Sequence, residues 1–304
     1  MAKSKFCLFL YSGLFLCVLL APSRTANAQG TIAPEELVAK HVKSIGDPGV
    51  LAAVQNRLSI GSSTVRFIQG ATGSMVGTSM VVSEGNKLVI TTKFGDKDYP
   101  GEYFAYDGKE VTVGHVNPGQ KSPIADFIFR NGRIIRDGLL GGTLSMNWPL
   151  LNIKERQPIL KCRTAKVDGK ELYELDYQPK DPLGNMKIKM YFEMDTFHHV
   201  RTEYRLRVTD DVSVRDDAPG AVSESASYET ARRSIKDDVP ESIYLLVEKF
   251  SDYKKVSGMI LPQGYSIEYS LEGTGHAFVA HWDLTAKQWG INRTWPAEFF
   301  KAQK

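Results

Sequence analysis

The sequence has only three cysteines, and two of them, Cys7 and Cys17, lie in an N-terminal segment that we expect to be removed. Cys162 then has no partner for an intrachain disulfide, so a hydrophobic core must stabilise the fold. No activating residue stands beside Cys162. We therefore expect a buried apolar side chain there rather than a reactive thiol.

An excess of charge of one sign is also lacking. Removing Lys3, Lys5 and Arg24 with the N-terminal segment lowers the 38 basic residues to 35, which equals the 35 acidic residues. Nucleic-acid binding depends on clustered lysine and arginine, and a neutral chain gives no electrostatic reason for it. We predict no nucleic-acid partner.

Motifs for catalysis and for metal binding are missing as well. The sequence contains no Gly-x-Ser-x-Gly, no His-Glu-x-x-His, no phosphate-binding loop and no paired cysteines. Ser251 and Lys254 have Ser-x-x-Lys spacing but lack its companion motifs. His198 and His199 are adjacent on a predicted strand and face opposite ways unless a bulge intervenes, while His41 is expected to pack on the apolar face of a helix. We predict no enzyme, metal or cofactor, and only a hydrolase whose carboxylates meet in space stays open.

Residues 1–28 have the three parts of a cleavable secretory signal. Two lysines precede an apolar stretch from Phe6 to Ala21, and Ala26-Asn27-Ala28 carries the small residues that a signal peptidase recognises. The apolar stretch is shorter than the roughly 20 residues of a membrane span. We expect cleavage after residue 28, export to the periplasm or beyond, and no integral membrane span afterwards.

The rest of the chain is predicted to be mainly β, in the α+β class, and to form a single domain over residues 29–304. A helix is expected at 34–45 and a short one from Asp47-Pro48, and from about Leu58 the pattern changes to period two. Similar alternation covers 186–192, 200–208, 265–271 and 278–284. In 200–208 one face is expected to carry Val200, Thr202, Tyr204, Leu206 and Val208. Strands with one wet and one dry face predict a curved antiparallel sheet, whose dry face the short helices cover.

Two segments interrupt this pattern. Residues at about 121–152 are apolar without period two, which predicts a helical insert. Within it, Gly141 and Gly142 are either a tight turn or a hinge beside an apolar lid. Residues at about 210–238 are acidic and rich in serine and alanine, which predicts a flexible loop.

The stretch from Phe250 to Pro262, Phe-Ser-Asp-Tyr-Lys-Lys-Val-Ser-Gly-Met-Ile-Leu-Pro, is followed by the strand Tyr265 to Tyr269. It resembles the late hairpin of the bacterial periplasmic lipoprotein-carrier and lipoprotein-sorting family, of which LolA and LolB are members. Gly258 permits the turn, and Pro262 is expected to end pairing at a strand edge. The resemblance implies an incomplete β-barrel with short helices across its concave face, enclosing an apolar cavity.

The same resemblance implies non-enzymatic binding and transport of a lipophilic cargo, either lipoprotein acyl chains or a lipid, in the periplasm. An alternative is a β-rich envelope interaction or sensor module with protein partners and no ligand cavity. The apolar side chains expected to form the cavity and its lid are Phe127, Leu139, Leu140, Leu144, Trp148, Ile188, Met190, Tyr204 and Leu206.

Overall fold

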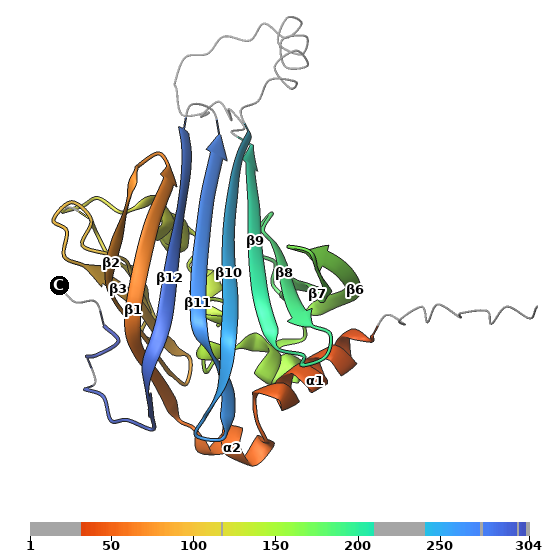
Figure 1. The fold of residues 1–304 in the computed structure, drawn as a ribbon. Helices are drawn as coiled ribbons and strands as arrows, with labels where there is room; N and C mark the ends of the chain where they lie inside the picture. The colour runs from red at the N-terminus through yellow and green to blue at the C-terminus, as the bar shows by residue number, and fades with distance from the viewer. Residues whose placement is uncertain (1–31, 117, 210–240, 274–275, 297, 302–304) are drawn as a thin grey trace, which may run out of the picture. The chain divides into compact units, whose positions relative to one another are not determined.

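The computed structural model describes residues 32–301 except 117, 210–240, 274–275 and 297 (Figure 1). The predicted signal at 1–28 and the predicted loop at 210–238 lie outside the described residues, so both stay predictions, as does the single domain. Within the described ranges, every helix falls short of the length and hydropathy that a membrane crossing needs.

The described chain begins with two helices, α1 (Pro34–Ile45) and α2 (Pro48–Ala53). Proline occupies the start of each helix, where its missing N–H needs no partner. Glu35 and Glu36 in the first turn of α1 favour the positive end of the helix dipole. The side chains that α1 buries are Leu37, Val38, His41 and Ile45.

All strands belong to one antiparallel sheet of 12 strands, in the order β5-β4-β3-β2-β1-β12-β11-β10-β9-β8-β7-β6 (Figure 1). The bounds are β1 Asn56–Gln69, β2 Gly73–Glu84, β3 Lys87–Phe94, β4 Tyr103–Tyr106, β5 Val111–Val113, β6 Ile159–Val167, β7 Lys170–Gln178, β8 Lys187–Glu193, β9 His199–Thr209, β10 Glu241–Val256, β11 Met259–Gly273 and β12 His276–Ile291. Among the described residues β5 and β6 do not pair with each other, so the curved sheet stays open. The predicted fold class is confirmed.

One face of the sheet is dry and carries the core. Period-two positions of β11 and β12, such as Tyr265, Ile267 and Trp282, are at most 3% exposed. They belong to one hydrophobic cluster with α1 and with the short helices between β5 and β6. The alternation read from the sequence therefore places the dry face correctly.

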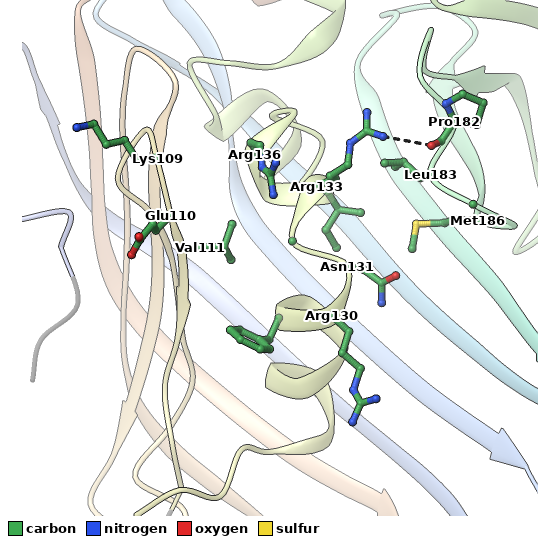
Figure 2. Close-up of a pocket in the computed structure, with 14 residues that line it drawn as sticks. Lys109, Glu110, Val111, Arg130, Asn131, Arg133, Arg136, Pro182, Leu183 and Met186 are labelled. Carbon is green, nitrogen blue, oxygen red and sulfur yellow. Dashed lines mark hydrogen bonds between the residues drawn. The ribbon is translucent and has the colours of Figure 1, made fainter. Parts of the chain in front are cut away.

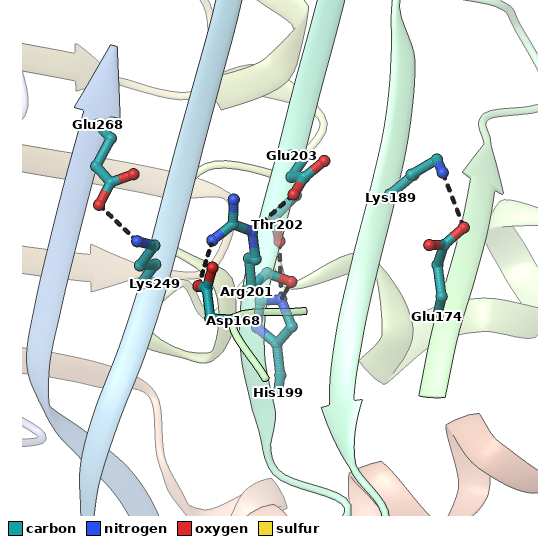
Figure 3. A network of polar contacts seen from close by, with 9 residues as sticks. All are labelled: Asp168, Glu174, Lys189, His199, Arg201, Thr202, Glu203, Lys249 and Glu268. Atoms are coloured by element: carbon teal, nitrogen blue, oxygen red, sulfur yellow. Dashed lines mark hydrogen bonds and ion pairs between the residues drawn. The ribbon is translucent and has the colours of Figure 1, made fainter. Parts of the chain in front are cut away.

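The opposite face carries ion pairs (Figure 3). Lys189 Nζ lies 2.9 Å from Glu174 Oε1 on the neighbouring strand, and Lys249 Nζ lies 2.6 Å from Glu268 Oε1. Arg201 pairs within its own strand and with a turn residue. Such partly exposed pairs stabilise a protein weakly, so we interpret this face as a solvated outer layer over β7–β11. Over β2–β4 the same face carries a second hydrophobic cluster, which contains Val82, Val89, Ala105 and Phe300.

A bulge in β9 corrects one predicted strand face. Tyr191 of β8 pairs with Arg201, whereas the next residue, Phe192, pairs with His199. One residue of β9, Val200, therefore has no pairing partner on β8. His199 is consequently fully buried, and Val200 is not. The prediction that Val200 shares the dry face is wrong, because a bulge shifts the alternation by one residue.

At the turn after β10, the predicted role of Gly258 is confirmed and that of Pro262 is wrong. Gly258 has φ 88° in the turn between β10 and β11, which glycine adopts without steric cost. Pro262 does not end the pairing, because it lies inside β11 opposite Tyr253. β12 joins β11 only from Gly264 onward, so β11 has a free side at Pro262, where proline is tolerated.

Candidate functional site

The segment between β5 and β6 covers the dry face. It contains α3 (Pro123–Arg130), α4 (Arg133–Arg136), the 3-10 turns η1 (Gly142–Leu144) and η2 (Pro149–Asn152), and then α5 (Ile153–Arg156). Because β5 and β6 are opposite edges of the sheet, the chain must pass from one edge to the other. We call residues 121–152 the insert.

The start of the insert is attached to a buried carboxyl group. The Ser122 hydroxyl accepts a hydrogen bond from Ala125 N (3.1 Å), which caps α3, and donates to Glu102 Oε2 (2.9 Å). The Tyr99 hydroxyl donates to the other oxygen of Glu102 (2.7 Å). Burial raises the pKa of Glu102 to about 7.

The middle of the insert is attached to a second buried carboxyl group, that of Glu248. Glu248 Oε1 accepts from Gly141 N (2.7 Å) and from the Tyr265 hydroxyl (2.6 Å). The Tyr204 hydroxyl lies 2.8 Å from both the Leu139 carbonyl oxygen and Glu248 Oε2.

These contacts fix the position of a proton. A carbonyl oxygen only accepts, so the single proton of the Tyr204 hydroxyl belongs to the Leu139 carbonyl. The short contact between Tyr204 and Glu248 then requires a proton on Glu248, which donates to Tyr204. Burial raises the pKa of Glu248 to about 7, which also favours the protonated carboxyl group. The carboxyl group is therefore neutral when the insert is closed.

The end of the insert is attached to α1. Trp148 Nε1 donates to His41 Nε2 (3.0 Å), and His41 Nδ1 lies 3.0 Å from the carbonyl oxygen of Phe197. His41 is 1% exposed, and burial lowers its pKa to about 4. The imidazole is thus neutral at pH 7, and His41 is a packed side chain, as the sequence predicts.

The glycine pair forms the tight turn that was one of the two alternatives. Gly141 has φ 85° and Gly142 has φ 49°, and Leu144 N bonds back to the Gly141 carbonyl (2.9 Å). A Cβ on Gly142 would lie 2.6 Å from the Phe250 ring and 2.9 Å from His199 Nδ1. Only glycine fits this close approach, and movement at the pair stays a prediction.

Beneath this turn lies a buried cation that the sequence did not reveal. Arg57 is 2% exposed and donates from a terminal nitrogen to the Thr143 carbonyl (2.6 Å). Burial lowers the pKa of Arg57 to about 10, and no neighbouring charge contributes to that shift. Arg57 therefore keeps its charge at pH 7 without a carboxylate partner among the described residues.

The nine predicted cavity and lid residues come together in one hydrophobic cluster. Eight of them are at most 4% exposed, and Leu206 is half-buried against the same cluster. Phe127, for example, has its ring centroid 5.9 Å from that of Tyr244 and 5.5 Å from that of Tyr269. In this closed arrangement they pack on one another, and their role in ligand binding stays a prediction.

An open groove of about 570 Å³ lies beside the insert (Figure 2). Three elements line it: the turn before β5, the α3–α4 corner and the β7–β8 loop. Arg133 links the α3–α4 corner to the β7–β8 loop, because it donates to the Pro182 carbonyl oxygen (3.2 Å). It also pairs with Asp137 at the end of its own helix (3.0 Å). None of the nine predicted residues lines the groove.

The described part of the chain contains no cluster of three potential metal ligands. Its two carboxyl groups at the insert, Glu102 and Glu248, contact hydroxyl groups and a backbone N–H rather than a second carboxyl group. Cys162 is half-buried, and burial raises the pKa of its thiol to about 11. A raised pKa keeps the Cys162 thiol protonated at pH 7.

Sequence reasoning missed Glu248, Arg57 and His199, although a signal existed for two of them. Glu248 stands at the dry position between Leu246 and Phe250, where a charged residue interrupts an apolar alternation. Arg57 likewise lies at a dry position of its strand. However, β1 begins at Asn56, before the predicted start of the period-two pattern at about Leu58, so the pattern was not applied to Arg57. The bulge that buries His199 has no comparable signature.

No protein-family model matches the chain, and no curated protein is found as a relative. Among solved structures, the chain is similar to an outer membrane lipoprotein-sorting protein domain from Vibrio parahaemolyticus. The identity is 10%, the TM-score is 0.42, and the match covers 88% of this chain and 96% of that one.

A second similar structure is a LolA superfamily protein from Nitrosomonas europaea. The identity is 12%, the TM-score is 0.41, and the match covers 89% of this chain and 98% of that one. Both structures bear the name of the family that the sequence resembles. A likeness at these values concerns the fold alone, and no cargo or partner follows from it.

Proposed function

We propose that this protein binds a lipophilic cargo, an acyl chain of a lipid or lipoprotein, on the dry face of the sheet beneath the insert. Transport of that cargo in the periplasm, after export by the predicted signal, is part of the proposal. The observation that carries it is an open, curved sheet whose apolar face is covered by a separate segment rather than by a second sheet.

The attachment of the insert supports a cover that can lift. Apart from apolar packing, the insert is held at a few polar points, at Ser122, Leu139, Gly141, Thr143, Met146 and Trp148. Each such hydrogen bond contributes roughly 0.5–1.5 kcal/mol to stability. Breaking several of them therefore costs only a few kcal/mol in all.

Apolar exchange supports the same proposal. When the insert lifts, the sheet loses contacts with side chains such as Leu140 and Trp148, and an acyl chain would replace them with similar contacts. The net free energy of this exchange is small, because one apolar neighbour substitutes for another. A carrier needs such a balance, since it must release its cargo as well as bind it.

The test is lipid binding by the purified full-length protein. The protein is isolated without detergent, and its bound lipids are identified by mass spectrometry. After delipidation it is titrated with a fluorescent fatty acid. We expect co-purified acyl lipid and saturable binding. A protein that carries no lipid and does not bind the fatty acid would refute the proposal.

A matched pair of tyrosine variants tests the role of the insert. Tyr204→Phe removes the hydroxyl that bonds to Leu139, so we expect fatty-acid association to become about fivefold faster. Tyr191→Phe is the control, because Tyr191 is also buried but belongs to the ion-paired face near Glu174. Equal association rates for both variants and the wild type would show that the insert does not control entry.

A second candidate function is an envelope interaction module without a ligand cavity. The close packing of the nine predicted residues favours it, because a filled dry face leaves no space while the insert stays closed. This candidate predicts protein partners in crosslinking of intact cells and no lipid in the purified protein. Acyl lipid in the purified protein would exclude it.

A further inference from the structure

Three unsatisfied polar atoms gather at one turn of the insert. Among the described residues, four buried side-chain atoms have no hydrogen-bond partner: Arg57 Nε, Thr143 Oγ1, His199 Nδ1 and Trp295 Nε1. Arg57 contacts the Thr143 carbonyl, and His199 Nδ1 lies 2.9 Å from the place of a Cβ on Gly142. We call Arg57, Thr143 and His199 the polar ring. Buried polar groups are nearly always paired, so three exceptions at one turn need a physical reason.

Charge distinguishes the polar ring from an ordinary packing defect. Arg57 carries a full positive charge, is 2% exposed and has no carboxylate partner among the described residues. An unpaired buried charge destabilises a protein, whereas an apolar residue of similar volume would not. Strongly perturbed charged groups of this kind are concentrated at functional sites.

The hydrogen-bonding roles define the missing partner. Arg57 Nε–H can only donate, so it needs an acceptor. His199 Nε2 lies 2.8 Å from Thr202 Oγ1, which can accept, and 3.0 Å from the Arg201 carbonyl, which only accepts, so Nε2 holds the ring proton and Nδ1 offers a lone pair. The hydroxyl of Tyr253 faces Thr143 but already donates to the His199 carbonyl. The matching group has anionic oxygens together with one O–H, as a singly protonated phosphate monoester has.

Apolar surface borders the polar ring directly. The centroid of the His199 ring lies 4.7 Å from that of the Trp148 ring and 4.8 Å from that of the Phe250 ring. All three side chains are at most 3% exposed. A ligand whose charged end reached Arg57 would therefore have its next atoms against aromatic side chains, which suits an alkyl chain.

We propose that the polar ring is a headgroup site for an anionic amphiphile, an acyl or alkyl chain that ends in a phosphate-class oxyanion. The Gly142–Thr143 turn covers the site in the closed arrangement, and the headgroup replaces the Thr143 carbonyl on Arg57 when the turn withdraws. This inference rests on the proposed function, because it requires the insert to lift. It adds the chemical class of the cargo.

The test compares ligands with one chain and two headgroups. Full-length, delipidated protein is titrated with dodecyl phosphate and with dodecyl glucoside, each below its critical micelle concentration. We expect dodecyl phosphate to bind at least about tenfold more tightly, because a charge-assisted hydrogen bond in a buried site discriminates strongly. Inorganic phosphate is titrated separately, and we expect it to bind at least about tenfold more weakly than dodecyl phosphate.

Variants separate a ligand role for Arg57 from a structural one. Arg57→Met should reduce the preference for dodecyl phosphate to less than twofold. Its thermal midpoint should change little, because the loss of the bond to the Thr143 carbonyl is offset by the removal of a buried charge that has no carboxylate partner among the described residues. A merely structural arginine would give a lower midpoint and an unchanged preference. The matched control is Arg136→Met, an exposed cation of the groove, which should keep the full preference. Thr143→Val, with nearly the same volume, should weaken dodecyl phosphate binding about threefold.

The outcomes distinguish this inference from the proposed function. Equal binding of dodecyl phosphate and dodecyl glucoside would overturn the headgroup site and leave the lipophilic cargo intact. Binding of neither amphiphile would overturn both. Inorganic phosphate that binds as tightly as dodecyl phosphate would assign the site to a free anion and overturn the amphiphile. If Arg57→Met kept the full preference for dodecyl phosphate over dodecyl glucoside, the headgroup site at Arg57 would also be overturned.

Discussion

The protonated carboxyl group of Glu248 leads to a prediction with a calculable size. An ordinary glutamate has a pKa of 4.5, and burial raises that of Glu248 to about 7. The folded protein then holds a proton between pH 4.5 and 7 that the unfolded chain has lost. Because the folded state binds more protons in this window, its stability falls as the pH rises from 4.5 to 7. The difference corresponds to about 3 kcal/mol in all.

The substitution Glu248→Gln isolates this contribution. A glutamine amide can donate to Tyr204 where the protonated carboxyl donates, and its carbonyl oxygen can accept from Gly141 N and Tyr265. We expect the variant and the wild type to have free energies of unfolding within about 1 kcal/mol at pH 4.5. At pH 8 the variant should be more stable by about 3 kcal/mol, since it has no proton to lose.

The assay is urea unfolding followed by tryptophan fluorescence between pH 4.5 and 8. Glu102 and His41 also titrate with shifted pKa values, but both are present in each protein and cancel in the difference. The matched control Glu268→Gln removes a carboxyl group of the outer face that pairs with Lys249, so it should not gain stability over the wild type at pH 8. A pH-independent difference between Glu248→Gln and the wild type would refute the proton assignment.

Loss of this proton should also loosen the insert. An ionised Glu248 attracts the Tyr204 proton, which then leaves the Leu139 carbonyl without a donor. We expect hydrogen exchange of insert amides to exceed the intrinsic base-catalysed increase between pH 6 and 8. In Glu248→Gln that excess should disappear.

Three further substitutions test single contacts. Gly142→Ala should destabilise the protein by about 2 kcal/mol in urea unfolding, because its Cβ would lie 2.6 Å from the Phe250 ring at φ 49°. Burial lowers the pKa of His41 to about 4, so the free energy of unfolding falls by about 3 kcal/mol as the pH falls from 6.5 to 4. His41→Gln should lack this decrease, which is checked by urea unfolding of the variant and the wild type at pH 6.5 and 4.5. Ser122→Ala removes the cap of α3 and a donor to Glu102 and should lower the free energy of unfolding by about 1–2 kcal/mol at pH 5.

The fold could be predicted because burial leaves a periodic trace in the sequence. Alternation such as Tyr265, Ile267 and Tyr269 reports a strand with one dry face, and successive strands of this kind that are joined by short turns pair antiparallel. The insert could be located for the opposite reason, since residues 121–152 lose that period. What periodicity cannot give is register, and the bulge at His199 is a change of register.

The polar part of the site depends on contacts between distant segments. Glu248 and Gly141 are 107 residues apart in the chain, and so are His41 and Trp148. A single sequence contains no information on which buried carboxyl meets which backbone N–H. The apolar members of the site lie in one cluster because any apolar residue on a dry face meets others, whatever its partner, and their role in cargo binding stays a prediction.

The free energies of the polar attachments suggest how cargo exchange is controlled. Apolar contacts of the insert are large but are replaced by those of an acyl chain, so they change little between the closed and loaded states. The hydrogen bonds at Glu248 and His41 have no such replacement, and they therefore set the free energy that a cargo must exceed. A cover attached only by apolar side chains would exchange with any chain of sufficient length. In the proposed carrier, buried polar attachments would make opening depend on the headgroup and on protonation, which would give ionisable groups a role in a core that hydrophobic residues could have filled.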